Sequence, residues 1–445
     1  MRRSGPSRGC GWGILRGPFC NLRELHYLCG KNQKNEQMKD FNFYAPTQVA
    51  FGRGAEERLP ELLRRYGATR VLIHYGGGSA RRSGLLDKVE ALLREAGIAY
   101  VGLGGVVPNP LLSKVEEGIA LCRREGVDFI LAVGGGSVID SAKAIGYGVP
   151  YEGEVWDFWA GRAVPQACLP IGVVLTIPAA GSEMSSSCVI TRDADLNKRG
   201  INSDLCRPRF AVMNPERTFT LPPYQTAAGA TDIMMHTMER YFTPEQDMTL
   251  TDALAEALLR TVRDAALDVM RRPDDYRQRA QLMWAGALAH NDLTECGTGK
   301  DFATHRLEHE LSALFGVTHG AGLAALWGSW ARYVMQPLPD GRPEDWPGQR
   351  TGIVPRFVQF AVNVMGVAND YTDPRGTAER GVEAMEAFYR TLGMPTSIHE
   401  LLGRDVTNDE IEHMVGMASR GGTMTLGQLR VLCEEDMRAI YRMAR

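Results

Sequence analysis

Short apolar runs alternate with amphipathic helices over residues 71–213, and few folds accommodate this alternation. The run at 129–133 contains no polar residue. A strand that is apolar at every position is buried on both faces, as in a parallel sheet with helices on each side. We therefore predict an α/β fold with a Rossmann-like parallel sheet. The predicted strands are 71–74, 99–103, 129–133, 173–177 and 210–213, and the predicted helices are 85–96, 111–124 and one from about residue 137.

A glycine turn follows the strand predicted at 129–133, and ligands bind beyond the carboxyl ends of strands in such sheets. Gly134, Gly135 and Gly136 let the backbone approach a ligand closely, and Ser137 opens a helix whose free N–H groups favour a phosphate. The turn is not the G-x-G-x-x-G fingerprint, and a glycine turn can be no more than a turn. Its strand–turn–helix context favours phosphate binding.

Two more loops follow predicted strands and are expected at the same edge of the sheet. Y-G-G-G-S-A-R-R (75–82) again leads from glycines into a helix and brings two arginines. T-I-P-A-A-G-S-E-M (176–184) offers Thr176, Ser182 and small residues, a polar rim without bulky side chains. The three loops together predict a site for a phosphate-containing cofactor.

Beyond residue 221 the pattern changes to helices only. Leu254, Leu258 and Val262 recur at helical spacing and indicate a long amphipathic helix, which we expect to begin after the cap Thr251. We predict two domains, an α/β dinucleotide-binding domain at 38–220 and an all-α domain at 221–445 that holds the metal and the substrate.

Residues 1–37 differ from the rest and are excluded from the fold prediction. They contain seven Lys or Arg and two acidic residues, without clear periodicity. We expect a disordered basic extension, or an upstream start with Met38 as the true first residue. A transit peptide is the alternative, because such peptides are Arg-rich and poor in acids, but Ser is scarce here and Glu24 and Glu36 interrupt the segment.

Charge and composition argue against several classes of partner. The net charge of −3 points to neither a nucleic acid nor an anionic membrane surface. No apolar run approaches the roughly 18 residues of a membrane helix. The nine cysteines form no C-x2-C pair, which favours reduced thiols in a cytoplasmic protein. We expect no nucleic-acid or membrane partner.

Three of the nine histidines fall within residues 301–322. Leucines at helical spacing predict a helix there, on which His305 and His309 lie at i and i+4 on one face. Gly316 breaks the pattern, and His319 follows on a predicted tight turn. Neutral imidazole is the commonest nitrogen ligand of divalent transition metals, so three imidazoles that converge suggest a metal.

A second i, i+4 pair, Asp232 and His236, lies upstream on a predicted apolar helix. An aspartate among methionines is costly to desolvate unless something positive meets it. Either pair alone can be an accident of a surface or core helix. Two such pairs on mostly apolar helices, with another histidine on a turn, favour a metal site.

These segments resemble the iron-containing (group III) alcohol dehydrogenases, and within them the butanol dehydrogenase and NADPH-dependent aldehyde reductase branch. The resemblance covers residues 41–445 and rests on four motifs in order. They are G-G-G-S-V-I-D-S-A-K, P-A-A-G-S-E-M, L-P-P-x-Q-x-A-x-G-x-x-D-x-x-x-H and A-T-H-x-L-x-H-E-L. The basic extension departs from the family, and P-A-A-G-S-E replaces its commoner threonine-rich form.

The resemblance implies a role for particular residues. It implies one divalent metal, Fe(II) or Zn(II), with Asp232, His236, His305 and His319 as ligands, and His309 as a histidine near the substrate. It implies that a nicotinamide cofactor, expected to be NADP(H), is bound by two glycine-containing loops and their neighbours. The residues expected to bind the cofactor are Gly77, Ser79, Asn109, Gly135, Gly136, Ser137, Asp140, Thr176, Ala179, Ser182 and Lys198.

The expected reaction is hydride transfer between a nicotinamide and a small aldehyde or primary alcohol, with the metal as Lewis acid. His309 either relays a proton or only orients a neighbour. The alternatives are a glycerol dehydrogenase-like or dehydroquinate synthase-like enzyme on the same architecture, and a metal-binding protein without redox chemistry, in which the glycine loops are only turns.

Cofactor choice and assembly are predicted from the first part of the chain. In dinucleotide folds an acid beyond the relevant strand takes the ribose 2′-hydroxyl and repels a 2′-phosphate. After 71–74 no acid occurs until Asp87, so we predict a preference for NADP(H). The segment 43–51, broken by Pro46, is predicted as a short strand pair. The family uses this region between subunits, and we expect a homodimer.

Overall fold

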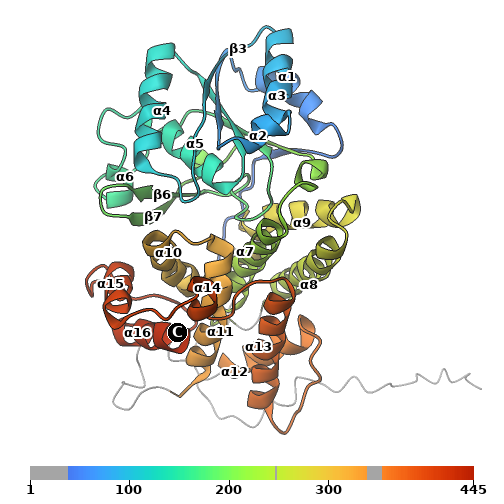
Figure 1. The fold of residues 1–445 in the computed structure, drawn as a ribbon, viewed down its shortest axis with the longest axis vertical. Coiled ribbons are helices and arrows are strands. Elements are labelled where there is room, and N and C mark those ends of the chain that lie inside the picture. Colours follow the sequence, from blue (N-terminus) through green and yellow to red (C-terminus); the bar gives the residue numbers. More distant parts are fainter. Residues whose placement is uncertain (1–38, 246–247, 338–352) are drawn as a thin grey trace, which may run out of the picture. The chain divides into compact units, whose positions relative to one another are not determined.

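Six parallel strands form the central sheet of the computed structural model, which describes residues 39–245, 248–337 and 353–445 (Figure 1). In spatial order they are β1 (Gln48–Phe51), β8 (Phe210–Met213), β5 (Ile171–Leu175), β4 (Phe129–Gly134), β2 (Arg70–Tyr75) and β3 (Ala99–Leu103). The predicted α/β fold is confirmed, although β5 begins and ends two residues before the predicted strand. The extension predicted at 1–37 lies outside the described residues.

Successive residues of each central strand face opposite layers of helices. On β4, Phe129, Leu131 and Val133 pack with α1 (Leu59–Arg65) and α3 (Leu85–Glu95). Ile130 and Ala132, on the other face, pack with α4 (Leu112–Glu125) and α5 (Gly136–Gly148). Because both faces are covered, every position of the strand is apolar.

The direction of the chain through the sheet reverses between β2 and β4. From β2 the chain passes through α2 (Ser79–Arg82) and α3 to β3 at one edge. It then returns through α4 to β4, on the other side of β2. The helices after β2 and β4 therefore lie on opposite faces of the sheet. Such a switch point opens a crevice beyond the carboxyl ends of the two strands.

One sequence prediction for the first part of the chain is wrong, and one element was missed. The predicted strand pair at 43–51 contains only β1, because its partner is the distant β8 rather than a neighbouring segment. An antiparallel hairpin, β6 (Ser187–Arg192) and β7 (Asn197–Asn202), was not predicted. Only short stretches of this hairpin are buried, so its apolar signal is weak.

Helices make up the second part of the chain. They are α7 (Pro223–Tyr241), α8 (Thr249–Arg271), α9 (Tyr276–Ala289), α10 (Ala303–Phe315), α11 (His319–Met335), α12 (Ile353–Asn363), α13 (Pro374–Thr391), α14 (Ile398–Leu402), α15 (Asn408–Ala418) and α16 (Glu434–Met443). The long helix α8 begins two residues before the predicted cap, and Thr251 instead donates a hydrogen bond to the carbonyl oxygen of Cys296 at 2.9 Å. The domain boundary at 220/221 stays a prediction.

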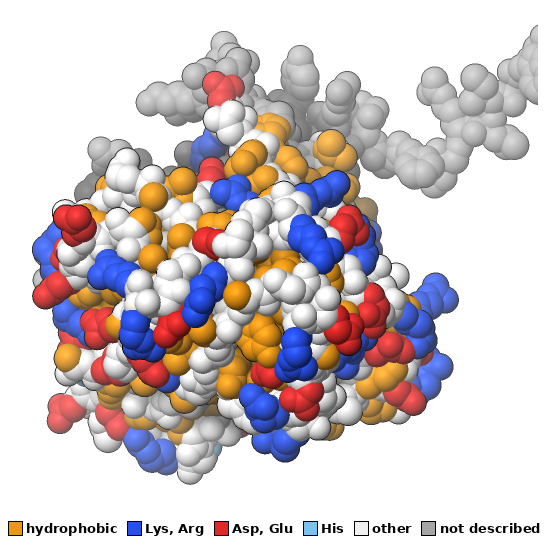
Figure 2. Space-filling model, turned by 90° about the horizontal axis from the view of Figure 1, so that it is seen from above, with side chains coloured by type: hydrophobic (Ala, Val, Ile, Leu, Met, Phe, Trp, Pro, Cys, Tyr) orange, Lys and Arg blue, Asp and Glu red, His pale blue; other side chains and the backbone are white. Residues whose placement is uncertain are grey.

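The charge on the surface and the apolar length of the helices concern the predictions about nucleic-acid and membrane partners. Seen from above, the described residues intersperse acidic and basic side chains, and no patch of one sign covers that face (Figure 2). Within the described ranges, no helix is both long and apolar enough to cross a membrane.

His74 is a polar exception inside the apolar strand β2. Its Nδ1 lies 3.0 Å from the carbonyl oxygen of Leu103 and its Nε2 lies 2.8 Å from Oγ of Ser141, so the ring joins β2 to β3 and α5. Burial lowers the pKa of His74 from 6.5 to about 4. The folded protein therefore keeps this imidazole neutral at pH values where the unfolded chain protonates it.

We predict that His74 makes unfolding easier in mild acid. Because the pKa of His74 is lower in the folded state, the contribution of this residue to the free energy of unfolding is complete above pH 6.5. That contribution, up to about 3 kcal/mol, is lost as the pH falls toward 4. Denaturant unfolding at several pH values should show this loss in the wild type and a smaller loss in His74→Gln. Parallel pH profiles of the two proteins would contradict it.

Candidate functional site

Three helices bring Asp232, His236, His305 and His319 to one place. Asp232 and His236 come from α7, His305 from α10, and His319 is the first residue of α11 rather than part of a free turn. Oδ1 of Asp232 lies 3.4, 3.6 and 3.8 Å from Nε2 of His236, His305 and His319, respectively. One carboxylate oxygen thus faces all three imidazoles.

Two of the atoms that face one another in this cluster, Oδ1 of Asp232 and Nε2 of His305, are buried and have no hydrogen-bond partner among the described residues. Ligand atoms of Asp232, His305 and His319 all lie within 4.8 Å of one another, and His236 is close to Asp232 but is not part of that mutual group. Buried acceptors that converge without a donor fit a divalent cation.

Two glutamates that the sequence analysis missed hold the outer nitrogens of two imidazoles. Nδ1 of His305 donates to Oε2 of Glu239 at 2.8 Å, and Nδ1 of His319 donates to Oε2 of Glu308. Each bond directs the ring's Nε2 toward Asp232. The sequence carried a signal, because each glutamate follows a histidine by three residues on an apolar helix, Glu239 after His236 and Glu308 after His305.

His309 lies beside the cluster, one turn along α10 from His305. Its ring centroid is 6.5 Å from that of His305 and 5.7 Å from that of His319. Its Nδ1 is buried and has no hydrogen-bond partner among the described residues. Burial, and then the charge of Lys198, holds the pKa of His309 well below its ordinary value, so the ring is neutral at neutral pH.

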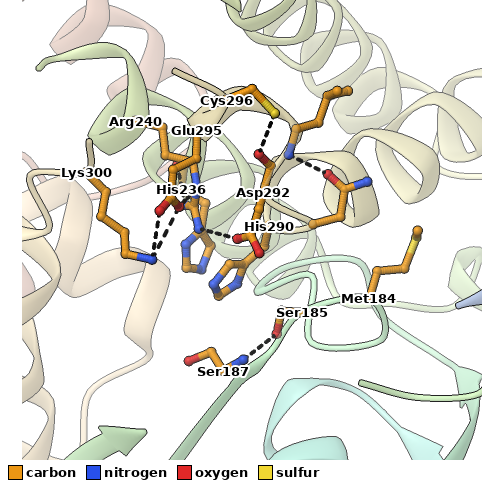
Figure 3. A network of polar contacts seen from close by, with 12 residues as sticks. Met184, Ser185, Ser187, His236, Arg240, His290, Asp292, Glu295, Cys296 and Lys300 are labelled. Atoms are coloured by element: carbon orange, nitrogen blue, oxygen red, sulfur yellow. Dashed lines mark hydrogen bonds and ion pairs between the residues drawn. The ribbon is translucent and has the colours of Figure 1, made fainter. Parts of the chain in front are cut away.

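His290 joins the helical part to the α/β part. Its ring stacks on that of His236 with centroids 4.1 Å apart, and its Nδ1 lies 2.6 Å from the carbonyl oxygen of Ala180. Figure 3 shows the two rings side by side, with Arg240 close by. The sequence analysis had no reason to place His290 here, since its contacts come from segments 54 and 110 residues away.

The loops predicted to bind the cofactor meet beyond the carboxyl ends of β2, β4 and β5. The amide of Thr176 donates to the carbonyl oxygen of Gly134 at 3.1 Å. A Cβ on Gly135 would come within 2.3 Å of Ile177, so the loops after β4 and β5 pack too closely for a side chain there. Gly135, Gly136 and Ser137 form the start of α5, as predicted from the sequence. Gly77 and Ser79 lie in the loop and short helix after β2, and Ala179 lies in the loop after β5.

Asp140 and Ser182 bind to each other rather than standing free. Oδ1 of Asp140 accepts from the Ser182 hydroxyl, and Oδ2 accepts from the amide of Val189 at 2.9 Å. The buried ammonium of Lys143, which was not predicted, donates to Oγ of Ser182 at 3.0 Å and to the carbonyl oxygen of Ser185 at 2.9 Å. These contacts shape the loop after β5.

Lys198 belongs to the hairpin, and Asn109 lies in a turn next to it. Nζ of Lys198, on β7, donates to Oγ of Ser312 at 2.9 Å and lies 3.8 Å from Oε2 of Glu308. Lys198 therefore reaches the metal-site helix α10. Asn109 adopts a left-handed backbone conformation (φ 55°), in the turn just before Leu111, which forms a β-bridge with Thr191 of β6.

Comparison with known proteins places this geometry in a family. The profile described as iron-containing alcohol dehydrogenase matches residues 46–215, and the profile of the C-terminal part of the Fe-containing alcohol dehydrogenase family matches residues 226–445. The chain is 38% identical to NADH-dependent butanol dehydrogenase A of Clostridium acetobutylicum, over 91% of this chain and 99% of the relative. It is 34% identical to the NADPH-dependent aldehyde reductase YqhD of Escherichia coli, over 92% and 100%.

A solved structure shares the fold. The crystal structure of NADH-dependent butanol dehydrogenase A from Thermotoga maritima superposes with a TM-score of 0.83 at 35% identity, covering 92% of this chain and 99% of that one.

We predict that His305→Ala and His319→Ala lose most bound metal, whereas His309→Ala keeps it. His309 is not one of the three histidines that face Oδ1 of Asp232, so its loss should slow turnover instead, by roughly 10²–10⁴ if it transfers a proton. Elemental analysis of the purified variants measures this, with the surface variant His413→Ala as control. Loss of metal from His309→Ala alone would show that the ligands are wrongly assigned.

Proposed function

The chain belongs to the iron-containing alcohol dehydrogenase family, and from this membership we propose that it is an NADP(H)-dependent aldehyde reductase. Membership makes it an oxidoreductase that acts on alcohols and aldehydes; the cofactor preference and the direction are our proposals. The observation that carries the proposal is the unpaired Asp232 oxygen facing three imidazoles, in a chain whose cofactor loops contact the same cluster through His290.

We assign the metal to Asp232, His236, His305 and His319. One carboxylate and three imidazoles suit Fe(II) or Zn(II), and the substrate oxygen would be a fifth ligand beside these four. When bound, the metal supplies Lewis-acid polarisation of the carbonyl oxygen and the nicotinamide supplies or accepts the hydride. The protein itself orients the ligands, because Glu239 and Glu308 bind the outer nitrogens of His305 and His319.

His309 is our candidate for proton transfer. A neutral, buried imidazole one turn from His305 can give or take the proton of the alcohol oxygen. Among the described residues, His305 and His319 each bind a glutamate through Nδ1, whereas Nδ1 of His309 has no hydrogen-bond partner.

The proposal is tested by following NADPH oxidation optically against a panel of short aldehydes with the metal-loaded enzyme. NADPH fluorescence that changes on binding, without turnover of any aldehyde, would favour a non-redox binding protein. Turnover of glycerol but of no aldehyde would favour the glycerol dehydrogenase-like alternative. A cytoplasmic location is part of the proposal, supported by Cys122, Cys168, Cys188, Cys206 and Cys296, which form no disulfide among the described residues.

The loop after β2 supports NADP(H). Gly77 has open space where a side chain would project, and a Cβ on Gly78 would meet Nη1 of Arg82 at 2.3 Å, so that guanidinium lies over the glycine turn. Arg81 instead pairs with Asp87 at 3.6 Å and contributes less. The butanol dehydrogenases named for NADH are 36–38% identical to this chain and the reductase named for NADPH is 34% identical, so the proposed preference rests on the loop after β2 and not on the names of relatives.

We predict that Gly77→Asp weakens NADPH far more than NADH. The new side chain meets no atom within 4 Å, so its effect should come from charge repulsion of the 2′-phosphate. The comparison is kcat/KM for both cofactors, with Gly77→Asn as a neutral control of the same shape. Equal use of NADH and NADPH by the wild type would refute the proposed preference.

We also propose a homodimer formed beside β1. This strand pairs with β8 on one side only, within the described ranges, and unpaired sheet edges tend to be covered. Apolar side chains nearby are unusually exposed, Phe43 at 47% and Phe51 at 42%.

Sedimentation at micromolar concentration should show a dimer, and Phe51→Lys should shift it toward monomer. A wild type that sediments only as a monomer would contradict the proposed assembly.

A further inference from the structure

His236 differs from the other two histidines of the metal cluster in how its ring is held. His305 and His319 each bind a glutamate through Nδ1. Nδ1 of His236 is buried and has no hydrogen-bond partner among the described residues. A histidine that binds a metal is ordinarily oriented by a hydrogen bond of its other ring nitrogen. The orientation of His236 therefore depends on what packs against its ring.

The ring of His290 supplies most of that packing. It stacks on the ring of His236 with centroids 4.1 Å apart and planes inclined by 25°, and Figure 3 shows the two rings side by side. The ring of His305 makes a second contact, with centroids 4.4 Å apart and planes inclined by 33°. A flat ring packed in this way opposes rotation of the imidazole, which would turn Nε2 of His236 away from Asp232.

His290 also binds the loop that follows β5. Its Nδ1 lies 2.6 Å from the carbonyl oxygen of Ala180, and a carbonyl oxygen only accepts, so Nδ1 donates. The same loop contains Thr176, Ala179 and Ser182, which are expected to bind the cofactor. One imidazole thus contacts a proposed metal ligand with its face and the proposed cofactor loop with its edge.

The loop has little freedom to move independently of His290. A Cβ on Gly181 would come within 2.8 Å of Cβ of His290, so the backbone of the loop lies directly against this residue. On its other side the loop lies against the glycine turn at the start of α5, where a Cβ on Gly136 would come within 3.3 Å of Cβ of Ala180. A displacement of His290 would therefore move the loop beside that turn.

We infer that His290 is a positioning residue for both parts of the site. Its ring orients His236 for the metal, and its Nδ1–H holds the loop after β5 in place for the cofactor. The inference rests on the proposed function, which requires a metal and a nicotinamide at this place.

Two substitutions separate the two roles. His290→Asn keeps an amide N–H near the position of Nδ1 but removes the ring. It should weaken metal binding by roughly 10- to 100-fold, the usual effect of losing a group that orients a ligand, and leave the Kd of NADPH nearly unchanged. His290→Phe keeps a flat ring but removes the donor. It should raise the Kd of NADPH by roughly three- to tenfold, the effect of one lost hydrogen bond, and leave metal binding nearly unchanged.

Both affinities are measured on the full-length chain. Metal binding is followed by titrating the metal-stripped protein with Zn(II) against a competing chelator. Cofactor binding is followed by the fluorescence of NADPH, and of NADH in parallel, with the Zn(II)-loaded protein. His413 is exposed on α15, so His413→Asn and His413→Phe should change neither affinity. Thermal unfolding of each variant checks that it is folded.

Three outcomes would overturn the inference. They are the loss of both affinities together in both variants, which would make His290 a structural residue only, the retention of both affinities in both variants, and the reverse pattern, in which His290→Phe loses the metal and His290→Asn keeps it. A wild type that binds Zn(II) but neither nicotinamide would contradict the proposed function instead, and the Zn(II) affinity of His290→Asn would still decide the role of the ring.

Discussion

The contact of one Asp232 carboxylate oxygen with three imidazoles is the constraint on which the site depends. A buried carboxylate of this kind is tolerable only if a cation or donors meet it. α7, α10 and α11 must therefore keep a fixed spacing, which their packing around a shared core provides. Glu239 and Glu308 fix the orientation of two of these imidazoles, because each binds the outer nitrogen of a ring that faces Asp232.

The two parts of the chain meet through a few polar contacts that serve the chemistry. His290 connects the metal cluster to the carbonyl oxygen of Ala180 in the loop after β5. Lys198 connects the hairpin to Ser312 on α10. A cofactor held by the sheet loops and a metal held by the helices would thereby be kept in register, which hydride transfer requires.

The sheet, its glycine loops and the metal-ligand candidates could be predicted from the amino-acid sequence. Strands buried on both faces are apolar throughout, and ligand pairs one helical turn apart can be recognised without a structure. The partner of β1, the contact of Lys198 with Ser312 and the place of His290 became known only from the folded chain. Each depends on contacts between segments far apart in the chain, and local spacing carries no information about them.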